Sequence, residues 1–164
     1  FVEHKLLYTC PIREPGRGDL VDYSMEINDG PYTTMVLHPP SASNITIATY
    51  GYNLELAISA SLELMMEHEI FCELVVFSQL SPCNLEALLP SVEKTKRLLL
   101  IEEGILPHGW GAEVTAQIHE KGYSVKTHRI GALQYPIANS KALENSILPS
   151  KNDIIQASMT LLGR

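Results

Sequence analysis

The sequence predicts an α/β protein folded as a three-layer α/β/α sandwich. From Asn44 onward, β-rich segments alternate with segments whose apolar residues recur at helical spacing. One β-rich segment, 97–101 (RLLLI), is continuously apolar after its first residue, as expected of a parallel strand that is covered on both faces. Strands that alternate with helices are joined by right-handed crossovers, which place helices on both sides of the sheet.

The first predicted elements lie between residues 32 and 77. A short β-type run at 32–38 stops at Pro39-Pro40, and residues 45–50 (ITIATY) are β-rich up to a glycine. Residues 53–67 place their apolar side chains on one helical face. The apolar segment 71–77 is predicted to be the next strand.

A second helix is predicted to begin at Ser81-Pro82. Serine is favoured as an N-cap and proline at the first helical position. Pro90 lies inside the predicted helix, where it removes a backbone donor and its ring clashes one turn back. We therefore expect a kink at Pro90, or two short helices that meet there.

The remaining elements follow residue 101. Residues 111–121 are predicted to be helical, and residues 124–130 to be a strand. A loop is expected at 131–140. Asp153 precedes two isoleucines and is predicted to cap a final helix that runs toward Leu162.

The first forty residues have a different composition. Residues 1–8 (FVEHKLLY) begin like the end of a strand, and the following CPIREPGRGDL has the composition of a linker. Residues 20–32 are polar, with a turn signal at Asp29-Gly30. Because the sequence opens with Phe1 and not with methionine, we expect a piece of a longer or processed polypeptide.

Charge and composition narrow the possible partners. Twelve basic and nineteen acidic residues give a net charge of −7, which repels phosphate backbones and argues against nucleic acid. A basic protein partner would be attracted to such a surface. Apolar residues make up 45% of the chain, but the longest apolar runs, 74–77 and 98–101, are too short for a membrane span.

The three cysteines, Cys10, Cys72 and Cys83, are widely and irregularly spaced, so neither a disulfide framework nor a CxxC zinc pair is expected. We expect a reducing compartment, either cytosol or an organelle matrix.

The segment 102–113 lies where open α/β sheets bind ligands, after a strand and at the start of a helix. It does not complete a GxGxxG motif, because position 114 is Val, and no P-loop lysine follows. Glu102 and Glu103 would repel a phosphate. Adjacent strand residues point to opposite faces, so these two carboxylates are not expected to act together in acid–base catalysis.

No other pattern predicts a catalytic or metal site. Of the six histidines, none belongs to an HxH or HExxH motif, and there is no GxSxG elbow. His108, flanked by Pro and Gly, is the one histidine that we consider as a functional candidate, with a structural loop histidine as the alternative. The sequence therefore predicts a module without catalytic, cofactor-binding or metal-binding residues of its own.

Five stretches resemble the C-terminal domain shared by transketolases, deoxyxylulose-phosphate synthases and the β components of 2-oxo acid dehydrogenases. They occur in the same order as in that family and span nearly all of residues 44–156. They are ITIATYGYNLELA (45–57), FSQLSPCNLEALLPSVEKTKRLLLIEEG (77–104), HGWGAEVTAQI (108–118), RIGALQYPIANSKALE (129–144) and LPSKNDII (148–155).

This resemblance implies a five-stranded, mostly parallel sheet in which the strand near 33–38 is antiparallel to the others. FVEHKLLY resembles the last strand of the pyrimidine-binding domain of dehydrogenase β components. Residues 1–32 are therefore expected to be the end of that domain and a linker, and residues 33–164 to be the transketolase C-terminal-like domain.

The resemblance also implies a function and partners. The parent enzyme would decarboxylate pyruvate or a branched-chain 2-oxo acid oxidatively and pass the acyl group to a lipoyl-acyltransferase. Thiamine diphosphate and Mg²⁺ would be bound outside this chain. The implied partners are the α component (E1 alpha), a second β component and the subunit-binding domain of the acyltransferase (E2), in the bacterial cytoplasm or the mitochondrial matrix.

For contacts with neighbouring subunits, we predict residues of the loop and helix start after 101. A large aromatic residue beside two glycines is a plausible interface anchor, although Trp110 could equally pack inside its own domain. Two alternatives stay open: another thiamine enzyme, such as a transketolase or a deoxyxylulose-phosphate synthase, or a free-standing flavodoxin-like nucleotide-binding domain. The predicted interface residues are Glu102, Glu103, His108, Trp110 and Glu113.

Overall fold

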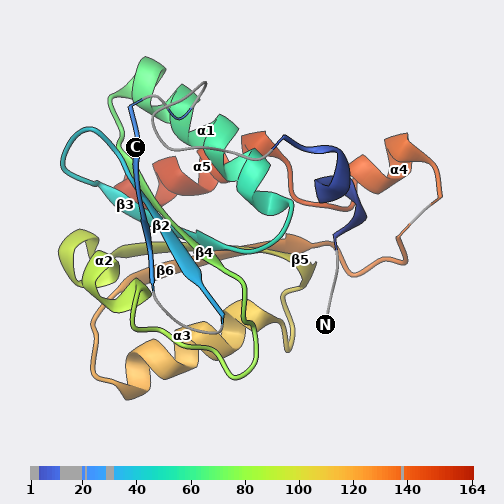
Figure 1. Ribbon diagram of the computed structural model, residues 1–164. Helices are drawn as coiled ribbons and strands as arrows, with labels where there is room; N and C mark the ends of the chain where they lie inside the picture. Colours follow the sequence, from blue (N-terminus) through green and yellow to red (C-terminus); the bar gives the residue numbers. More distant parts are fainter. Residues whose placement is uncertain (1–3, 12–19, 21, 29–31, 138) are drawn as a thin grey trace.

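The computed structural model describes residues 4–11, 20, 22–28, 32–137 and 139–164. These residues form the expected three-layer α/β/α sandwich (Figure 1). The central sheet has the strand order β1-β2-β4-β3-β5-β6. Its strands are β1 (Ser24–Ile27), β2 (Thr34–His38), β3 (Ile45–Thr49), β4 (Cys72–Phe77), β5 (Arg97–Ile105) and β6 (Lys126–Ala132).

The strand directions agree with the expectation, but the strand count does not. β3, β4, β5 and β6 are parallel, and β2 pairs with β4 in the antiparallel direction. The described residues form six strands, not five, because β1 adds to the outer side of β2. This short edge strand has the sequence SMEI and exposes three of its four residues, so it carries no periodic apolar signal.

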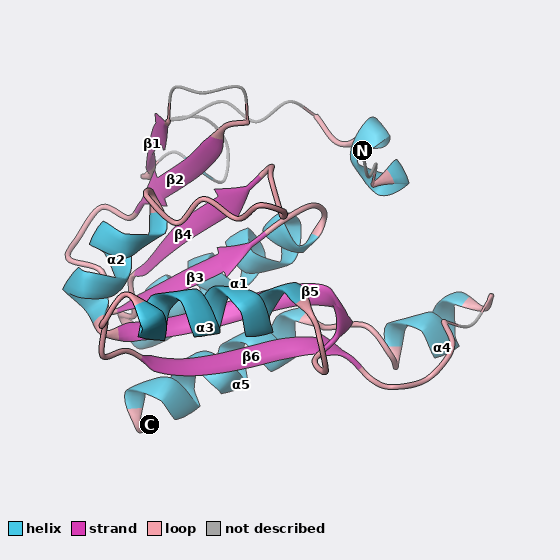
Figure 2. Cartoon of the chain, turned by 90° about the horizontal axis from the view of Figure 1, so that it is seen from below, coloured by secondary structure: helices cyan, strands magenta, loops and turns pink. Residues whose placement is uncertain are grey.

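Two helices cover each face of the sheet. α1 (Asn53–His68) and α5 (Lys151–Leu162) lie on one face, and α2 (Leu88–Thr95) and α3 (Trp110–Glu120) lie on the other (Figures 1 and 2). Each pair of helices closes a separate apolar core against the sheet. Burial of one large aliphatic side chain contributes about 1.5–3 kcal/mol, so these cores are the main source of stability.

The prediction of a helix from Ser81 was wrong, because α2 begins only at Leu88. The preceding loop is held by the side chain of Asn84, whose Oδ1 accepts a hydrogen bond from the Glu86 amide at 2.9 Å. Pro90 is the third residue of α2, in the first turn, where backbone amides have no partner within the helix. Proline is tolerated there, and the expected kink at Pro90 is not needed.

The C-terminal part also differs in detail. Ser150, not Asp153, is the N-cap of α5, and Asp153 accepts a hydrogen bond from the Ser150 amide at 2.8 Å. This reciprocal arrangement is a capping box. The predicted loop after β6 leads into an additional short helix, α4 (Lys141–Asn145), which projects from the sandwich in Figure 2.

The expected strand at residues 1–8 is not found among the described residues. Lys5–Thr9 form a 3-10 helix, with a hydrogen bond from the Leu7 amide to the His4 carbonyl at 3.0 Å. Residues 1–3 and most of the predicted linker lie outside the described part of the chain. The division into domains at residues 32 and 33 stays a prediction.

Candidate functional site

The loop between β5 and α3 joins the carboxyl edge of the sheet to a helix start, as the sequence predicted. β5 continues past residue 101 to Ile105, but its pairing with β6 is irregular between Ile101 and Ile105. This irregularity interrupts the pairing with β6 after Ile101. Glu102 and Glu103 lie within it, and they point to opposite faces of the sheet, as expected.

Glu102 is 1% exposed, and its carboxylate lies against the first turn of α3. Oε1 accepts a hydrogen bond from the Gly111 amide at 3.1 Å, and the Trp110 amide is a second backbone donor. Burial raises the pKa of the Glu102 carboxyl, while these amides and the Arg129 charge oppose the rise. Glu102 therefore supplies the negative charge that a helix N-terminus favours.

Glycines make room for this carboxylate. A Cβ added to Gly109 would overlap the Glu102 carboxyl group, and one added to Gly111 would lie 3.0 Å from Oε1. The space at which an α/β fold would hold a phosphate is thus filled by a side chain of the chain itself. Glu102 is buried within the chain, and its role in contacts between subunits stays a prediction.

Glu103 faces the other side, toward the N-terminal segment. His4 Nε2 lies 2.7 Å from Glu103 Oε1, and the imidazole stacks on Tyr52 with ring centroids 5.5 Å apart. This contact fastens the segment before β1 to the carboxyl end of β5. A role of Glu103 in contacts between subunits stays a prediction.

Trp110 packs within its own domain. Its ring makes edge contacts with Tyr50 and Phe77, both at a centroid distance of 5.2 Å. The Cys83 thiol lies beside it, and burial raises the pKa of that thiol. Trp110 is partly buried against the apolar core of this face, which agrees with the alternative that we left open for it.

His108 and Glu113 are the exposed members of the predicted set. His108 has φ 57°, a left-handed backbone conformation. Glu113 lies on the first turn of α3, where its Oε1 accepts a hydrogen bond from Gln117 Nε2 at 2.7 Å. Of the five predicted residues, these two offer the most accessible side chains, and their interface role stays a prediction.

The residue list from the sequence missed an apolar surface after β6. Four large side chains there are at least half exposed: Leu133 (52%), Tyr135 (68%), Ile137 (51%) and Leu143 (59%). We call them the 133–143 surface. The high density of large apolar residues in ALQYPI, which was predicted to be a loop, is the sequence signal that could have identified it.

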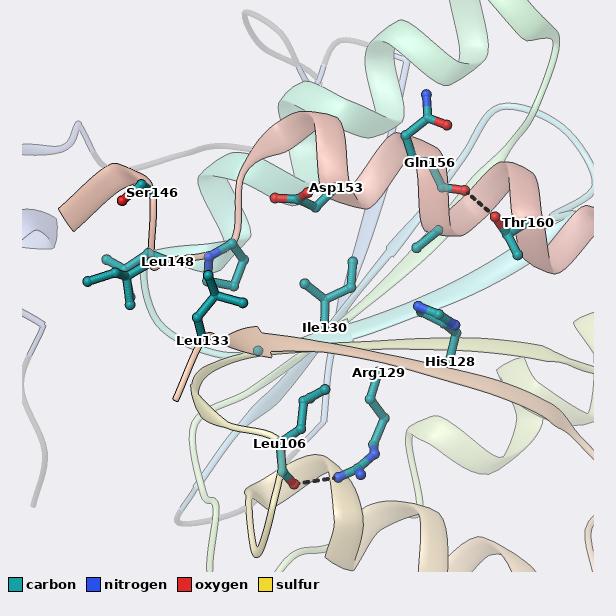
Figure 3. A pocket seen from close by; sticks show the side chains of 14 residues that line it. Leu106, His128, Arg129, Ile130, Leu133, Ser146, Leu148, Asp153, Gln156 and Thr160 are labelled. Carbon is teal, nitrogen blue, oxygen red and sulfur yellow. Dashed lines mark hydrogen bonds between the residues drawn. The ribbon is translucent and has the colours of Figure 1, made fainter. Parts of the chain in front are cut away.

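A cavity of about 440 Å³ adjoins the 133–143 surface (Figure 3). It lies between β6 and α5, with Ile130 and Ala157 buried in its floor and Asp153 and Gln156 on its rim. Arg129 points away toward the other face, where its guanidinium donates to the Leu106 carbonyl at 2.9 Å. His128 and Asp153 also line the cavity.

Comparison with known proteins identifies the family. The model of the transketolase C-terminal domain matches residues 35–154. The chain belongs to this family. A curated relative, the pyruvate dehydrogenase E1 component subunit beta-1 of Arabidopsis thaliana, is 29% identical over 163 residues, which cover 96% of this chain and 42% of the relative.

Two further comparisons give another relative and a solved structure with a similar fold. The acetoin:2,6-dichlorophenolindophenol oxidoreductase subunit beta of Bacillus subtilis is 29% identical over 124 residues, 74% of this chain and 36% of the relative. A solved split-gene transketolase, an inactive β4 tetramer, has a TM-score of 0.69 at 21% identity and covers 92% of this chain and 44% of its own. The latter confirms the transketolase C-terminal fold.

The chain spans less than half the length of these relatives. Among the described residues of this transketolase C-terminal domain, no group of three or more acidic, histidine or cysteine side chains could hold a metal ion. The described helices include none with the length and apolar character needed to cross a membrane. The α3 N-terminus, filled by Glu102, does not fit a diphosphate.

Proposed function

We propose that this chain is the C-terminal assembly and docking domain of the β component of a thiamine-diphosphate-dependent 2-oxo acid dehydrogenase. The observation that carries the proposal is the family match at residues 35–154 combined with pyruvate dehydrogenase β subunits among the relatives. The parent enzyme would decarboxylate a 2-oxo acid, with pyruvate as the first candidate, and transfer the acyl group to a lipoyl-acyltransferase. Thiamine diphosphate and Mg²⁺ would be held outside this domain.

The α3 N-terminus supports an assembly role over a nucleotide-binding role. A phosphate at this helix N-terminus would need the space that the Glu102 carboxylate occupies, where it accepts a hydrogen bond from the Gly111 amide. Glu102 would have to leave its place before an anionic ligand could enter. This arrangement favours a function in contacts at the outer surface of the domain over ligand binding at the carboxyl edge of its sheet.

The 133–143 surface is the first candidate for contacts with the α component or a second β component. Exposed Tyr135 and Leu143 provide the large apolar area that the centre of a stable protein interface needs. The net charge of −7 supports docking of a basic subunit-binding domain of the acyltransferase, because opposite charges steer association.

A direct test uses the full-length β component and its cognate α component. The expected result is thiamine-diphosphate-dependent decarboxylation of pyruvate by the reconstituted pair and no activity of either component alone. Branched-chain 2-oxo acids should be compared in the same assay. Acetoin, with dichlorophenolindophenol as electron acceptor, is a second candidate substrate because of the Bacillus subtilis relative.

Assembly is tested separately by the double substitution Tyr135→Ser and Leu143→Ser. We expect the reconstituted complex to dissociate at least tenfold more readily in analytical ultracentrifugation, because central apolar contacts dominate interface energies. Met66→Ser, on α1 and 74% exposed, is the matched control and should assemble normally. Normal assembly of the double variant would exclude the 133–143 surface as the contact.

Docking of the acyltransferase is tested by binding of its subunit-binding domain to the reconstituted enzyme at low and high salt. Affinity should fall as salt rises, because screening weakens attraction between exposed charges. Salt-independent binding, or none, would overturn the docking proposal without affecting the decarboxylation result.

A further inference from the structure

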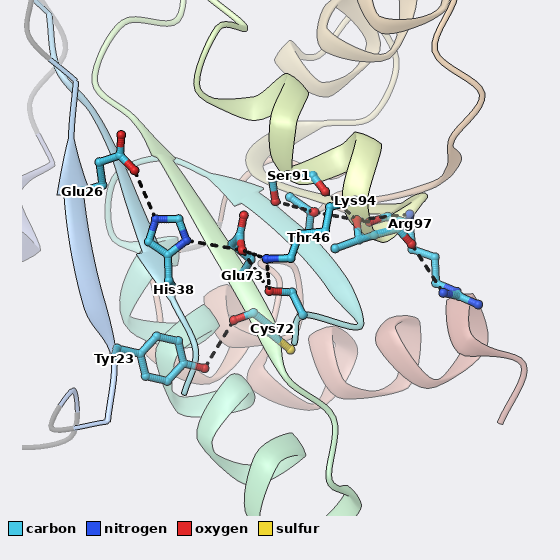
Figure 4. A network of polar contacts seen from close by, with 11 residues as sticks. Tyr23, Glu26, His38, Thr46, Cys72, Glu73, Ser91, Lys94 and Arg97 are labelled. Carbon is cyan, nitrogen blue, oxygen red and sulfur yellow. Dashed lines mark hydrogen bonds and ion pairs between the residues drawn. The ribbon is translucent and has the colours of Figure 1, made fainter. Parts of the chain in front are cut away.

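A histidine lies between two carboxylates where the edge strand β1 meets the rest of the sheet (Figure 4). His38 Nε2 is 3.4 Å from Glu26 Oε2 on β1, and His38 Nδ1 is 3.4 Å from Glu73 Oε2 on β4. The strand register explains this placement. Glu26 pairs with Val36, so His38, two residues further, is its diagonal neighbour on the same face of the sheet.

The two carboxylates differ in their surroundings. Glu73 is 3% exposed and is already bound by Lys94 Nζ at 3.0 Å and by the Ser43 hydroxyl at 2.9 Å. Glu26 has a side chain that is 67% exposed, and His38 is the ion-pair partner recorded for it among the described residues. The side-chain contact between β1 and β4 on this face is therefore made by the imidazole of His38.

The protonation state of His38 decides how much of this interaction is made. A neutral imidazole has no net charge, so it makes no ion pair with either carboxylate. The imidazolium carries a positive charge that attracts the carboxylates of Glu26 and Glu73 together, each at 3.4 Å. Lys94, beyond Glu73, partly compensates the negative charge of this pair, whereas Glu26 has no cation besides His38 in the described contacts.

We propose that His38 is a proton-dependent clasp that holds the edge strand β1 on the sheet. Histidine changes its charge between pH 5 and 8. Protonated His38 attracts Glu26 of β1 and Glu73 of β4, and deprotonation removes both ion pairs. The strand is held otherwise by its backbone pairing with β2 and by the side chains of Met25 and Ile27 on the opposite face.

Release of β1 has a specific consequence on that opposite face. Met25 and Ile27 line an apolar cavity of about 580 Å³ together with Leu7 of the N-terminal 3-10 helix and with Leu37 of β2. Loosening of β1 would open this cavity and free the N-terminal segment from one of its contacts. The proton would thus control how firmly residues before β2 are attached to the domain.

His4 provides a natural contrast. Its Nε2 lies 2.7 Å from Glu103, but its Nδ1 is buried without a hydrogen-bond partner among the described residues. The neutral tautomer with a proton on Nε2 makes the whole contact, and a second proton would bury an unpaired donor. The His4–Glu103 contact therefore does not require protonation.

The test is hydrogen exchange of the full-length protein at pH 6 and pH 8, with rates corrected for intrinsic exchange and read by mass spectrometry. In the wild type, amides of residues 24–27 should lose protection by about threefold to tenfold at pH 8, as expected for one or two partly exposed ion pairs. Residues 45–49 of the buried strand β3 serve as the internal reference.

Variants distinguish loss of the His38 contacts from a general loss of stability. Glu26→Gln, an exposed substitution, should lower the protection of β1 at pH 6 and remove the dependence on pH. His38→Gln should do the same, whereas His4→Gln should retain it. Equal protection of β1 at both pH values in the wild type, or a dependence that persists in Glu26→Gln and His38→Gln, would overturn the proposal.

Discussion

The carboxylate of Glu102 accepts a hydrogen bond from the Gly111 amide at 3.1 Å. A side chain of the same chain thus occupies the anion-binding position at the N-terminus of helix α3. The interaction is buried, and glycines at 109 and 111 allow the close approach. Its removal should therefore have two measurable results, a loss of stability and an available anion site.

Glu102→Ala should lower the free energy of unfolding by about 2–3 kcal/mol, because it leaves buried backbone donors unpaired. The same variant should be stabilised by inorganic phosphate, which can occupy the vacated space at the helix N-terminus. Urea denaturation with and without phosphate measures both effects. Glu113→Ala, exposed on the same turn, is the control and should change stability by no more than about 0.5 kcal/mol.

Gly109→Ala should be destabilising, by about 2 kcal/mol or more, because its Cβ would overlap the Glu102 carboxyl group. Gly104→Ala is a matched control, since a Cβ there would lie at an ordinary 3.6 Å from the same side chain. Combining Gly109→Ala with Glu102→Ala should cost less than the sum of the two changes. Additive losses would contradict the proposed steric cause.

The two buried glutamates should affect stability with opposite dependence on pH. For Glu73, burial raises the pKa, but hydrogen bonds from Ser91, Lys94 and Ser43 and the Lys94 charge outweigh it, so the pKa lies below its usual 4.5. A lowered pKa stabilises the fold above pH 4.5, and that stability is lost as pH falls through the folded-state value.

Glu73→Gln should therefore flatten the loss of stability between about pH 5 and pH 3 in urea titrations. Glu102 has a raised pKa, so its contribution has the opposite sign: it is largest below pH 4.5 and is lost as pH rises through the folded-state value. Glu102→Gln should consequently make the protein relatively more stable at neutral than at acid pH. If both substitutions changed the slope in the same direction, the assigned shifts would be wrong.

The capping box of α5 should be worth about 1 kcal/mol. Ser150→Ala removes the hydroxyl that accepts the Asp153 amide, and thermal unfolding should show the loss. Ser150→Asp keeps an acceptor at the cap and should restore most of the stability. Ser124→Ala, at an exposed position outside the helices, is expected to be neutral.

Much of the fold was accessible from the sequence because buried strands and amphipathic helices carry periodic apolar patterns. The RLLLI run became the first part of β5, and the strand near 33–38, whose antiparallel direction the family resemblance implied, became β2. The edge strand β1 was missed because its stability comes from backbone pairing and not from an apolar pattern. The start of α2 was misplaced because Ser81-Pro82 also suits a loop, and local preference does not distinguish the two.

The loop between β5 and α3 was placed correctly, but the contacts of its side chains were only partly predicted. The opposite orientation of Glu102 and Glu103 follows from the alternation of a strand, and it is confirmed. The burial of Glu102 required knowledge that Gly109 and Gly111 would approach it closely in space. The imidazole of His38 lies between Glu26 and Glu73, which are 47 positions apart in the sequence. No local sequence pattern predicts such a contact.

Because Trp110 packs between Tyr50 and Phe77, the protein contains an intrinsic fluorescence probe at a defined place. The 164 residues contain one tryptophan, so intrinsic fluorescence reports on a single place, the junction of α3 with β3 and β4. Circular dichroism averages over every helix and strand. A difference between the two signals during unfolding would reveal that this junction melts separately from the rest of the sandwich.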